Sequence, residues 1–491
     1  MMKQIKIIPI LLAILFLFSG CKSGSDKDSS SGKIATEILT YYQKFVKIKV
    51  TNNSNVSTGS LRYSKSGASG FEIFMKGSPN GICTTELCPD ACEDGSALHT
   101  GGSCYIYIHA LDSSPSTGEI NIINHSANQT IVFGLTKLEK LYVGGTFTNA
   151  LGKRYVAKFD PITSTWTELL MPTYNTGQYI GIYTMSWGVD GNLYASGSFK
   201  NSLGKQYVAK FDPKTSTWTE LPQPPTPFSN TIYLAKFDAN GNLYVLNNNY
   251  NLEKFDPKTL TWTELATNFN SSANDMNFDA TGNLYIGGNF TNALGERYVA
   301  KFDPKTSTWT KLPQPTTPFN ATISTVTFDA IGNLYIGGNF INAFGEQYVA
   351  KFDPQTEKWT DLPQPIAPVA PLNSHIQVMN FDATGNLYIG GNFTNAEGKR
   401  YVGKFDPQTL TWTELPQPTA PFNNFIMAMS WGADDNLYTG GDFTNPLDNE
   451  YVAKFDPKTS TWTKLPQPTP PFNGRINTMN FSNDLVVTRI A

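Results

Sequence analysis

The chain has 491 residues, of which 40% are hydrophobic and 16% are charged, and its formal net charge is −3. This length and composition are enough for more than one domain with a large buried core. The slightly acidic balance, with no basic stripe, argues against a nucleic acid as partner.

The first twenty residues predict an export signal. Two lysines precede the apolar run Ile7–Phe18, which is too short to span a bilayer as a mature helix. The run leads into Ser19-Gly20-Cys21, and small residues before a cysteine resemble the signal of bacterial lipoproteins, although leucine is usual where Phe18 stands. The resemblance implies that residues 1–20 are removed and that Cys21 carries a lipid anchor in a membrane. It also implies a location in the bacterial cell envelope, at the outer membrane or cell surface. The alternative is an ordinary cleaved signal peptide, in which case Cys21 has no special role.

Residues 21–33 consist mainly of Ser, Gly, Lys and Asp, which predicts a flexible tether. Residues 34–127 then contain short β-like runs between turn-rich stretches, the pattern of a small β-sandwich. These runs are Phe45–Val50, Phe71–Met75, Tyr105–His109 and Glu119–Ile123. The segments that resemble immunoglobulin-like accessory domains of bacterial envelope proteins are Val50–Ser54, Gly101–Ile108 and Gly118–Ile122. That resemblance implies an immunoglobulin-like fold for this domain.

Four cysteines lie in this domain, namely Cys83, Cys88, Cys92 and Cys104. An even number in an exported domain predicts two disulfides, for which three pairings are possible. A zinc site is the alternative, but the spacing Cys-x4-Cys-x3-Cys-x11-Cys is unusual for zinc fingers. We therefore expect disulfides and no metal.

From residue 128 on, the chain is dominated by a repeat of about 50 residues. Its most regular phrase, Leu-Tyr-Ile-Gly-Gly-Asn-Phe, has versions that start at Leu141, Leu193, Leu243, Leu284, Leu334, Leu387 and Leu437. One unit contains four β-like runs, Ile323–Phe328, Leu334–Phe340, Tyr348–Phe352 and Trp359–Leu362, with turn residues such as Asp-Ala-Ile-Gly-Asn and Asp-Pro-Gln-Thr between them. Four short antiparallel strands in each unit predict an all-β fold, a β-propeller.

The repeat resembles the kelch repeat. The resemblance rests on paired glycines such as Gly337-Gly338, on an aromatic residue before Asp-Pro, and on the tryptophan that follows. It implies a kelch-like β-propeller over residues 128–491, with seven blades preferred and eight left open. The first inner strand is expected at Gln129–Leu135. The surplus segments Ile476–Phe481 and Leu485–Ile490 either latch the ring against the first blade or begin an eighth.

Seven tryptophans recur at one position of the repeat, and we expect them to pack blade against blade with one partner for each indole N–H. They are Trp166, Trp218, Trp262, Trp309, Trp359, Trp412 and Trp462. The paired glycines are expected to let neighbouring backbones approach closely.

No catalytic constellation stands out in the repeats. Some kelch-type propellers are copper oxidases, but a two-histidine site cannot form because His375 is the only histidine of the repeats. Turns such as Asp329-Ala-Ile-Gly-Asn333 contain oxygen atoms that could bind calcium, but calcium needs six or more oxygen ligands and one turn has too few. The residue types of these turns are explained by the requirements of a β-hairpin. The repeats are also close copies, whereas an active site collects different residue types. We therefore expect no cofactor, no metal and no enzyme, while a carboxylate-based activity stays open.

Binding is expected on the end of the propeller with the longer loops, where the strand 2–3 loops and the blade-to-blade loops emerge. The candidates for this face are Arg154, Arg297, Arg400, Phe319, Phe422, Phe472 and His375. The alternative is packing beneath the proline-rich linkers for the phenylalanines, a solvated rim position for the arginines, and an ordinary loop for the histidine. Two departures from symmetry indicate where a specific site is sought: the short loop Asn247–Glu253 and the long crossing loop Pro363–Ser374.

Together these features predict non-catalytic binding of a protein or a glycan at the bacterial envelope. Near copies of one unit suit a scaffold or a multivalent binder. The alternatives are a periplasm-facing assembly scaffold, by analogy with the propeller lipoprotein of the outer-membrane barrel-assembly machinery, and a carbohydrate-active propeller enzyme.

Overall fold

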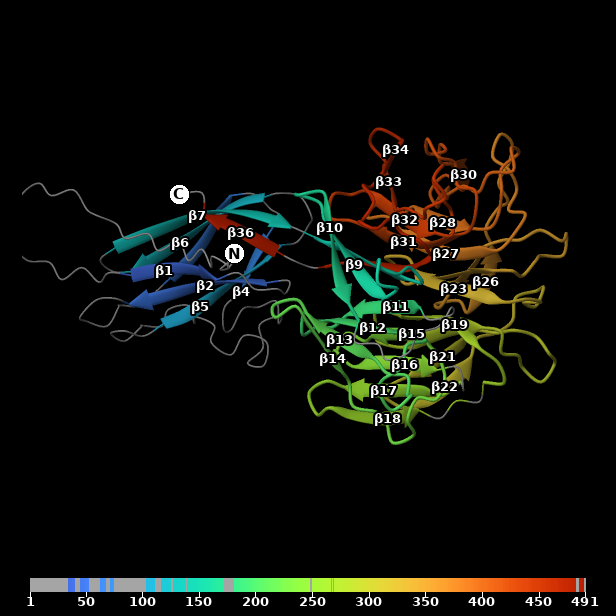
Figure 1. Ribbon diagram of the computed structural model, residues 1–491, viewed down its shortest axis with the longest axis horizontal. Coiled ribbons are helices and arrows are strands. Elements are labelled where there is room, and N and C mark those ends of the chain that lie inside the picture. The colour runs from blue at the N-terminus through green and yellow to red at the C-terminus, as the bar shows by residue number, and fades with distance from the viewer. Residues whose placement is uncertain are drawn as a thin grey trace, which may run out of the picture.

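A β-propeller and an N-terminal pair of β-sheets make up the described part of the chain (Figure 1). The computed structural model describes residues 139–482 with their side chains, except for 172–180, 248–249, 266 and 268. Outside that range it describes the strands between Ile34 and Lys137, with Ser103 and Cys104, and the strand Leu485–Arg489. The elements in these residues are all β-strands and none is a helix, so the predicted all-β fold is confirmed.

Seven four-stranded antiparallel sheets form the blades of the propeller. Blade 1 contains β8 (Leu141–Gly145), β9 (Tyr155–Asp160), β10 (Thr165–Leu170) and β35 (Ile476–Phe481), and blade 2 contains β11 (Ile182–Trp187), β12 (Leu193–Gly197), β13 (Ala209–Asp212) and β14 (Thr217–Glu220). Blade 3 contains β15 (Ile232–Phe237), β16 (Leu243–Asn247), β17 (Leu252–Asp256) and β18 (Thr261–Leu265), and blade 4 contains β19 (Ala273–Phe278), β20 (Leu284–Gly288), β21 (Ala300–Asp303) and β22 (Thr308–Lys311). Blade 5 contains β23 (Ile323–Phe328), β24 (Leu334–Gly338), β25 (Ala350–Asp353) and β26 (Lys358–Asp361), and blade 6 contains β27 (Ile376–Phe381), β28 (Leu387–Gly391), β29 (Gly403–Asp406) and β30 (Thr411–Glu414). Blade 7 contains β31 (Ile426–Trp431), β32 (Leu437–Gly441), β33 (Ala453–Asp456) and β34 (Thr461–Lys464), so the preferred number of seven is confirmed.

The ring closes by sharing blade 1 between the two ends of the repeat region. Strand β35 pairs with β8 and thereby supplies the inner strand of the first blade from the C-terminal side. The expected inner strand Gln129–Leu135 was wrong, because that segment belongs to a strand of the N-terminal sheets. Of the two alternatives for Ile476–Phe481, the latch is correct.

The N-terminal strands form two four-stranded antiparallel sheets. The first has the order β1 (Ile34–Leu39), β2 (Phe45–Asn52), β5 (Ser103–Ala110), β4 (Phe71–Phe74), and the second has the order β3 (Arg62–Gly67), β6 (Ser116–Asn124), β7 (Ala127–Lys137), β36 (Leu485–Arg489). Since β7 pairs with β6 and β36, the boundary of the propeller lies near residue 139 and not at 128. The last strand of the chain therefore leaves the propeller and joins the N-terminal sheet. An immunoglobulin-like topology for these sheets stays a prediction.

Inside a blade, burial falls from the middle strands outward. The second strand is buried at every residue, as in Leu334–Gly338, while the fourth strand is largely exposed. A Cβ on Gly337 would lie 2.7 Å from Ile376 of the next blade, and one on Gly338 would clash with the carbonyl oxygen of Thr322. The paired glycines thus permit close approach of backbone and neighbouring blade, as predicted.

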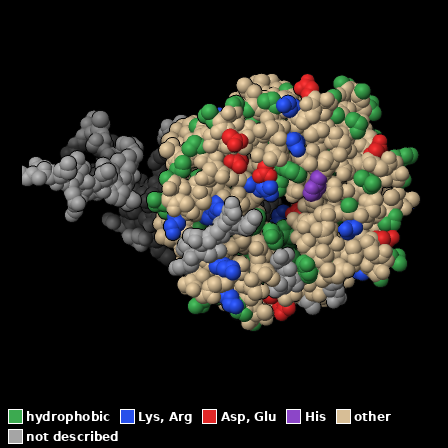
Figure 2. All heavy atoms as spheres, turned by 45° about the vertical axis from the view of Figure 1, so that its right-hand side comes forward, with side chains coloured by type: hydrophobic (Ala, Val, Ile, Leu, Met, Phe, Trp, Pro, Cys, Tyr) green, Lys and Arg blue, Asp and Glu red, His purple; other side chains and the backbone are tan. Residues whose placement is uncertain are grey.

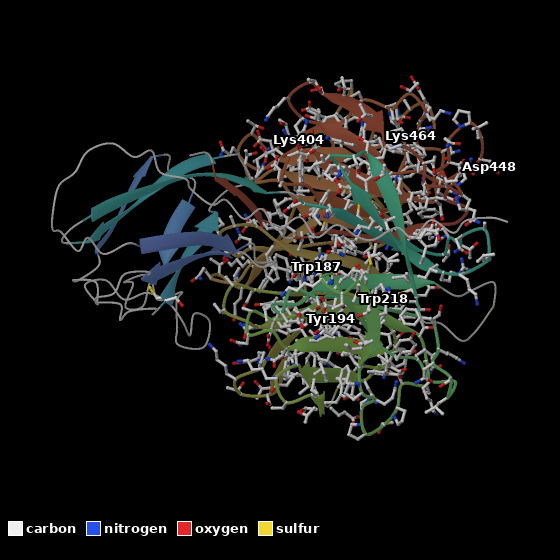
Figure 3. All side chains as sticks on the ribbon, turned by 60° about the vertical axis from the view of Figure 1, so that its left-hand side comes forward. Trp187, Tyr194, Trp218, Lys404, Asp448 and Lys464 are labelled. Carbon is white, nitrogen blue, oxygen red and sulfur yellow. The ribbon has the colours of Figure 1, made fainter. Side chains whose placement is uncertain are left out.

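Five of the seven recurring tryptophans join their blade to the linker that precedes it around the ring. The indole Nε1 of Trp359 donates to the carbonyl oxygen of Pro313 over 2.6 Å, and equivalent bonds hold Trp166, Trp262, Trp412 and Trp462. Figure 3 labels Trp187 of blade 2, whose ring centroid lies 5.1 Å from that of Tyr142 in blade 1. The predicted blade-to-blade packing is confirmed for the five tryptophans that bond to a linker, whereas the expected partner for each indole N–H is wrong for Trp218, whose buried Nε1 has no hydrogen bond within the described residues.

Candidate functional site

Each inner strand of the propeller carries a β-bulge near its first residue. In blade 5 the pairing of β23 with β24 shifts register between Ile323 and Thr325, so Ser324 is the extra residue. In a regular strand, successive side chains point to opposite sides of the sheet. A bulge lets two successive side chains point to the same side. The bulged residues around the ring, from blade 1 to blade 7, are Asn477, Tyr183, Tyr233, Asn274, Ser324, Gln377 and Met427.

These seven side chains line the mouth of the central channel. The channel holds a cavity of about 730 Å³, whose lining comes from all seven inner strands and from the residues just before them. Figure 2 shows the opening on one face of the propeller, with basic side chains and a histidine beside it. A cavity of this size lies within the range of about 300–1,000 Å³ that is usual for small-molecule sites.

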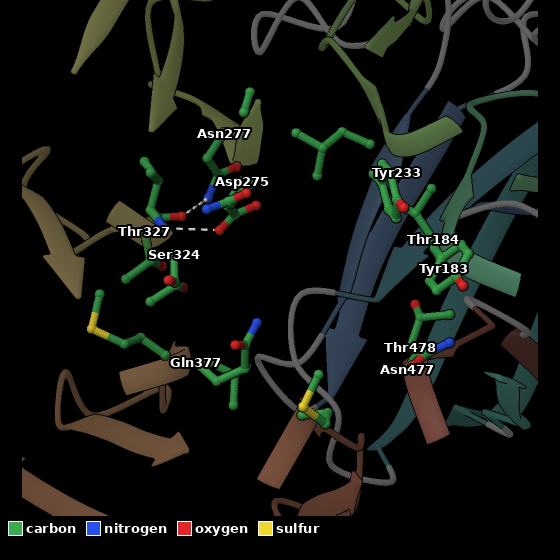
Figure 4. A pocket seen from close by; sticks show the side chains of 18 of the residues that line it. Tyr183, Thr184, Tyr233, Asp275, Asn277, Ser324, Thr327, Gln377, Asn477 and Thr478 are labelled. Atoms are coloured by element: carbon green, nitrogen blue, oxygen red, sulfur yellow. Dashed lines mark hydrogen bonds between the residues drawn. The ribbon is translucent and has the colours of Figure 1, made fainter. Parts of the chain in front are cut away.

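One side of the channel mouth is aromatic. The rings of Tyr183 and Tyr233 are 5.0 Å apart between centroids, with an angle of 49° between their planes. Tyr233 is 41% exposed although it lies on an inner strand. The close-up view places the two tyrosines across the cavity from Asp275, Ser324 and Gln377 (Figure 4).

Amide side chains on both flanks of the tyrosines tie neighbouring blades together. Asn477 Nδ2 donates to the carbonyl oxygen of Ile182 over 2.9 Å, and Asn274 Nδ2 donates to that of Ile323 over 3.3 Å. Each bond uses one of the two N–H donors of the amide and leaves the amide oxygen as an acceptor at the mouth. Gln377 lines the cavity too, and its amide has no hydrogen bond within the described residues.

Ser324 and His375 form a close pair at the same level. The Oγ of Ser324 lies 2.5 Å from Nε2 of His375, and burial lowers the pKa of this histidine because it disfavours the charged imidazolium. The predicted candidate His375 is therefore part of the channel mouth. A serine hydrolase would also need a carboxylate on the Nδ1 of His375, and the described residues provide none. The pair is suited to hold one polar group of a ligand or to connect blades 5 and 6.

A carboxyl group from blade 4, that of Asp275, also lines the cavity. Asp275 accepts hydrogen bonds from the backbone nitrogens of Val326 and Met276, each over 2.8 Å. Burial raises its pKa, and the charge of Lys236 on blade 3 opposes that rise. The carboxyl group thus joins blade 4 to blade 5 and has a cation nearby.

The remaining cation of the mouth is already paired. Arg475 Nε donates to Oδ1 of Asp442 over 2.6 Å, and a second nitrogen of the guanidinium lies 2.5 Å from Oδ2. This fork joins the residue before β35 to blade 7. Among the described lining residues, the two cations Lys236 and Arg475 therefore each lie near a carboxylate.

The three predicted phenylalanines are not on the accessible face. Phe319, Phe422 and Phe472 are each 1% exposed. Phe319 packs with Trp359, and the ring centroids are 5.0 Å apart. Their assignment as binding contacts was wrong, and the alternative of packing beneath the linkers is correct, because each fills the space between a linker and the next blade.

The predicted arginines support loops at the rim. Arg400 donates through Nε and Nη2 to Oδ1 of Asn392 and through Nη1 to the carbonyl oxygen of Asn423. Arg297 donates through Nη1 to Asn320 in the same way, over 2.8 Å. Burial lowers the pKa of Arg154, against the opposing effect of nearby Tyr183. These contacts hold the strand 2–3 loops to the linkers, and a ligand-binding role of the three arginines stays a prediction.

Several predicted features fall outside the described residues. These are Cys21, Cys83, Cys88 and Cys92. Cys104 is described and is disulfide-bonded, but the pairing stays a prediction because the other cysteines are not described. Within the described residues, no three His, Cys, Asp or Glu side chains are grouped as metal ligands would be. The same part of the chain contains no helix with the length and apolarity that a membrane span requires.

The sequence-based search for a site missed the channel residues. The seven inner strands share buried residues at their first and fourth positions, such as Ile376 and Met379, and a partly buried aromatic residue at the sixth, such as Phe381. Between them, the second, third and fifth positions differ from blade to blade. That variation in otherwise similar repeats is the sequence signal that indicates the channel residues.

Comparisons with known proteins support the propeller. Residues 250–368 and 366–490 match the family model of the Rax2 C-terminal beta propeller domain. The kelch-like assignment is not part of that match and stays a prediction. The sequence matches no curated protein.

Two solved structures are similar to this chain. The first is the extracellular domain of a one-component system from B. thetaiotaomicron, with 14% identity and a TM-score of 0.46 over 65% of this chain and 39% of that one. This chain thus spans well under two thirds of that protein's length. The second is a streptogramin B lyase, with 12% identity and a TM-score of 0.44 over 71% of this chain and 98% of that one.

Proposed function

We propose that this protein is a non-catalytic binding protein of the bacterial envelope. In this proposal a lipid on Cys21 anchors the chain in a membrane, residues 21–33 act as a tether, and the propeller binds a protein or a glycan at its channel mouth. The seven-bladed ring provides the rigid support on which such a site is built.

The observation that carries the proposal is the difference among the inner strands. Their buried positions are kept in all blades, while their channel-facing positions change from tyrosine to asparagine, serine, glutamine and methionine. Repeats that only had to pack would not need this variety at the one place where seven blades meet. A cavity with convergent polar and aromatic groups is the default ligand site of an unassigned structure.

The arrangement favours binding over catalysis. Ser324 and His375 lack the carboxylate of a triad within the described residues, and the carboxyl oxygens of Asp275 accept backbone N–H groups. Groups held in this way can position a ligand, but they do not form a set of nucleophile, base and oxyanion donors.

The binding proposal is tested by filling the channel. Gln377→Trp adds bulk to the cavity from a side chain that has no hydrogen bond within the described residues. Gln408→Trp is the matched control, since Gln408 lies in an exposed turn at the other end of blade 6. Arrays of glycans and of envelope and matrix proteins should bind the parent chain and the control alike and lose the channel variant. Binding that survives Gln377→Trp in a folded protein would contradict the proposal.

The envelope location needs its own experiment. Protease added to intact cells should reach the propeller if it is displayed outside, and a Cys21→Ala variant should leave the membrane fraction. Protection of the propeller until the outer layer is breached would favour the internal scaffold. A Cys21→Ala protein that remains membrane-bound would rule out the lipid anchor.

A further inference from the structure

We propose that the ligand of the channel mouth is the end of an uncharged glycan, stacked on Tyr183 and Tyr233 and held by the amides and hydroxyls opposite. This inference rests on the proposed binding function and names the class of ligand. It follows from three properties of the cavity: its aromatic side, its polar side and its charge balance.

The aromatic side offers ring faces to a ligand. Tyr183 and Tyr233 come from neighbouring inner strands, and their planes are tilted by 49° instead of stacked on each other. The ring faces of tyrosine carry partial negative charge, which attracts the polarised C–H groups on the face of a sugar ring. Tyr233 is 41% exposed, so part of its surface is open to the channel. In the described propeller, no other pair of adjacent bulged residues is aromatic.

The polar side suits hydroxyl groups in particular. Asn274 and Asn477 each donate one N–H to the next blade, which fixes the amide and leaves its oxygen as an acceptor at the mouth. The amide of Gln377 can both donate and accept, and the Ser324–His375 pair presents a further polar edge. A hydroxyl also donates and accepts, so a ring with several hydroxyls can satisfy these groups at once. Bonds to backbone carbonyls set the directions of the Asn274 and Asn477 amides, which lowers the ordering cost of binding.

The charge balance of the lining favours a neutral ligand. Arg475 is paired with Asp442, and Lys236 lies close enough to Asp275 to stabilise its charge. A sulfated or sialylated glycan would have to lose its hydration without a free counter-charge among the described lining residues. The same argument disfavours an acidic or basic peptide. The cavity of about 730 Å³ admits a short oligosaccharide end and not a folded domain.

The test is an array of neutral, sialylated and sulfated oligosaccharides, followed by titration calorimetry of the hits with the mature full chain. We expect neutral members to bind, with affinity that changes less than about twofold between low and high salt. Tyr233→Ala should weaken binding by about tenfold or more, since it removes a stacking ring, while Tyr233→Phe should stay within about threefold. A preference for anionic glycans, a strong salt dependence, or equal binding by Tyr233→Ala would overturn the inference.

The outcomes also separate this inference from the proposed function. If a protein ligand binds and is lost in Gln377→Trp, while no glycan binds, the channel is a binding site and the glycan inference is wrong. If no ligand of either class responds to Gln377→Trp, the proposed function itself fails. Thermal unfolding of each variant shows whether it remains folded.

Discussion

A buried glutamate in blade 3 provides the sharpest test of the packing described above. Glu253 occupies the position on the third strand that is alanine or glycine in the other blades, namely Ala157, Ala209, Ala300, Ala350, Gly403 and Ala453. It is 2% exposed, and its Oε2 has no hydrogen-bond partner within the described residues. Burial and the charge of Glu264 on the paired strand raise the pKa of Glu253 to about 7. Ionisation of this carboxyl group therefore lowers the free energy of unfolding.

The expected effect of Glu253→Ala depends on pH. Because the folded-state pKa lies above the unfolded value of 4.5, the folded protein loses stability as pH rises from 4.5 through 7, and the loss is complete above 7. A pKa of about 7 in place of 4.5 corresponds to roughly 3 kcal/mol, which is an upper bound on the gain from the substitution. We predict that Glu253→Ala and Glu253→Gln raise the free energy of unfolding by about 1–3 kcal/mol at pH 8 and by little at pH 5.

The assay is urea unfolding at pH 5, 6, 7 and 8, followed by tryptophan fluorescence. Glu397→Ala is the control, since Glu397 is an exposed loop residue of blade 6 and should change stability by less than about 0.5 kcal/mol at any of these pH values. Destabilisation by Glu253→Ala at pH 8, or a gain that does not vary with pH, would refute the reasoning. The first result would mean that the carboxylate has favourable partners when ionised, and the second that folding does not raise the pKa of Glu253.

Three further predictions concern glycine, ring closure and histidine. Gly338→Ala should destabilise the protein by more than about 3 kcal/mol, because the added methyl group clashes with backbone atoms. Gly345→Ala should cost about 1 kcal/mol, since the position has open space and a positive φ of 80°. Thermal unfolding of the two variants tests this difference. A chain that stops before Ile476 should fail to close the ring and should be cut rapidly by protease, while a chain that stops after Ser482 should keep a resistant propeller. His375→Gln should flatten the loss of stability between pH 7 and pH 5, because burial holds the pKa of His375 below its unfolded value and protonation on acidification favours the unfolded state. An unchanged pH profile for that variant would contradict the burial of a neutral imidazole.

Much of the propeller could be predicted because its repeats report on local structure. The glycine pairs, the Asp-Pro turns and the tryptophans each act within one blade or between adjacent blades, and the structure gives them the expected roles. Strand pattern does not identify the partner of a strand, however. Gln129–Leu135 has the alternation of an inner strand, yet it pairs within the N-terminal sheet, and β35 takes the place of the inner strand beside β8. Ring closure is a long-range pairing that local sequence does not encode.

The binding site was harder to predict for a different reason. An alternating pattern such as Ile323–Phe328 places every second residue on one face, but the bulge in β23 brings both Ser324 and Thr325 to the channel. The phenylalanines on the linkers were wrongly predicted to be exposed because they lie in loops. In the structure each ring packs against a tryptophan of the following blade. Of the predicted site residues, His375 is the one that the structure brings to the channel mouth.

The measurement that tests the account most directly is the affinity of one neutral oligosaccharide hit for the mature parent chain, for Gln377→Trp and for Gln408→Trp. The account predicts equal binding by the parent and by Gln408→Trp, and none by Gln377→Trp at the same thermal stability. Equal affinity of all three proteins would show that the ligand binds elsewhere and would contradict a binding site in the channel mouth.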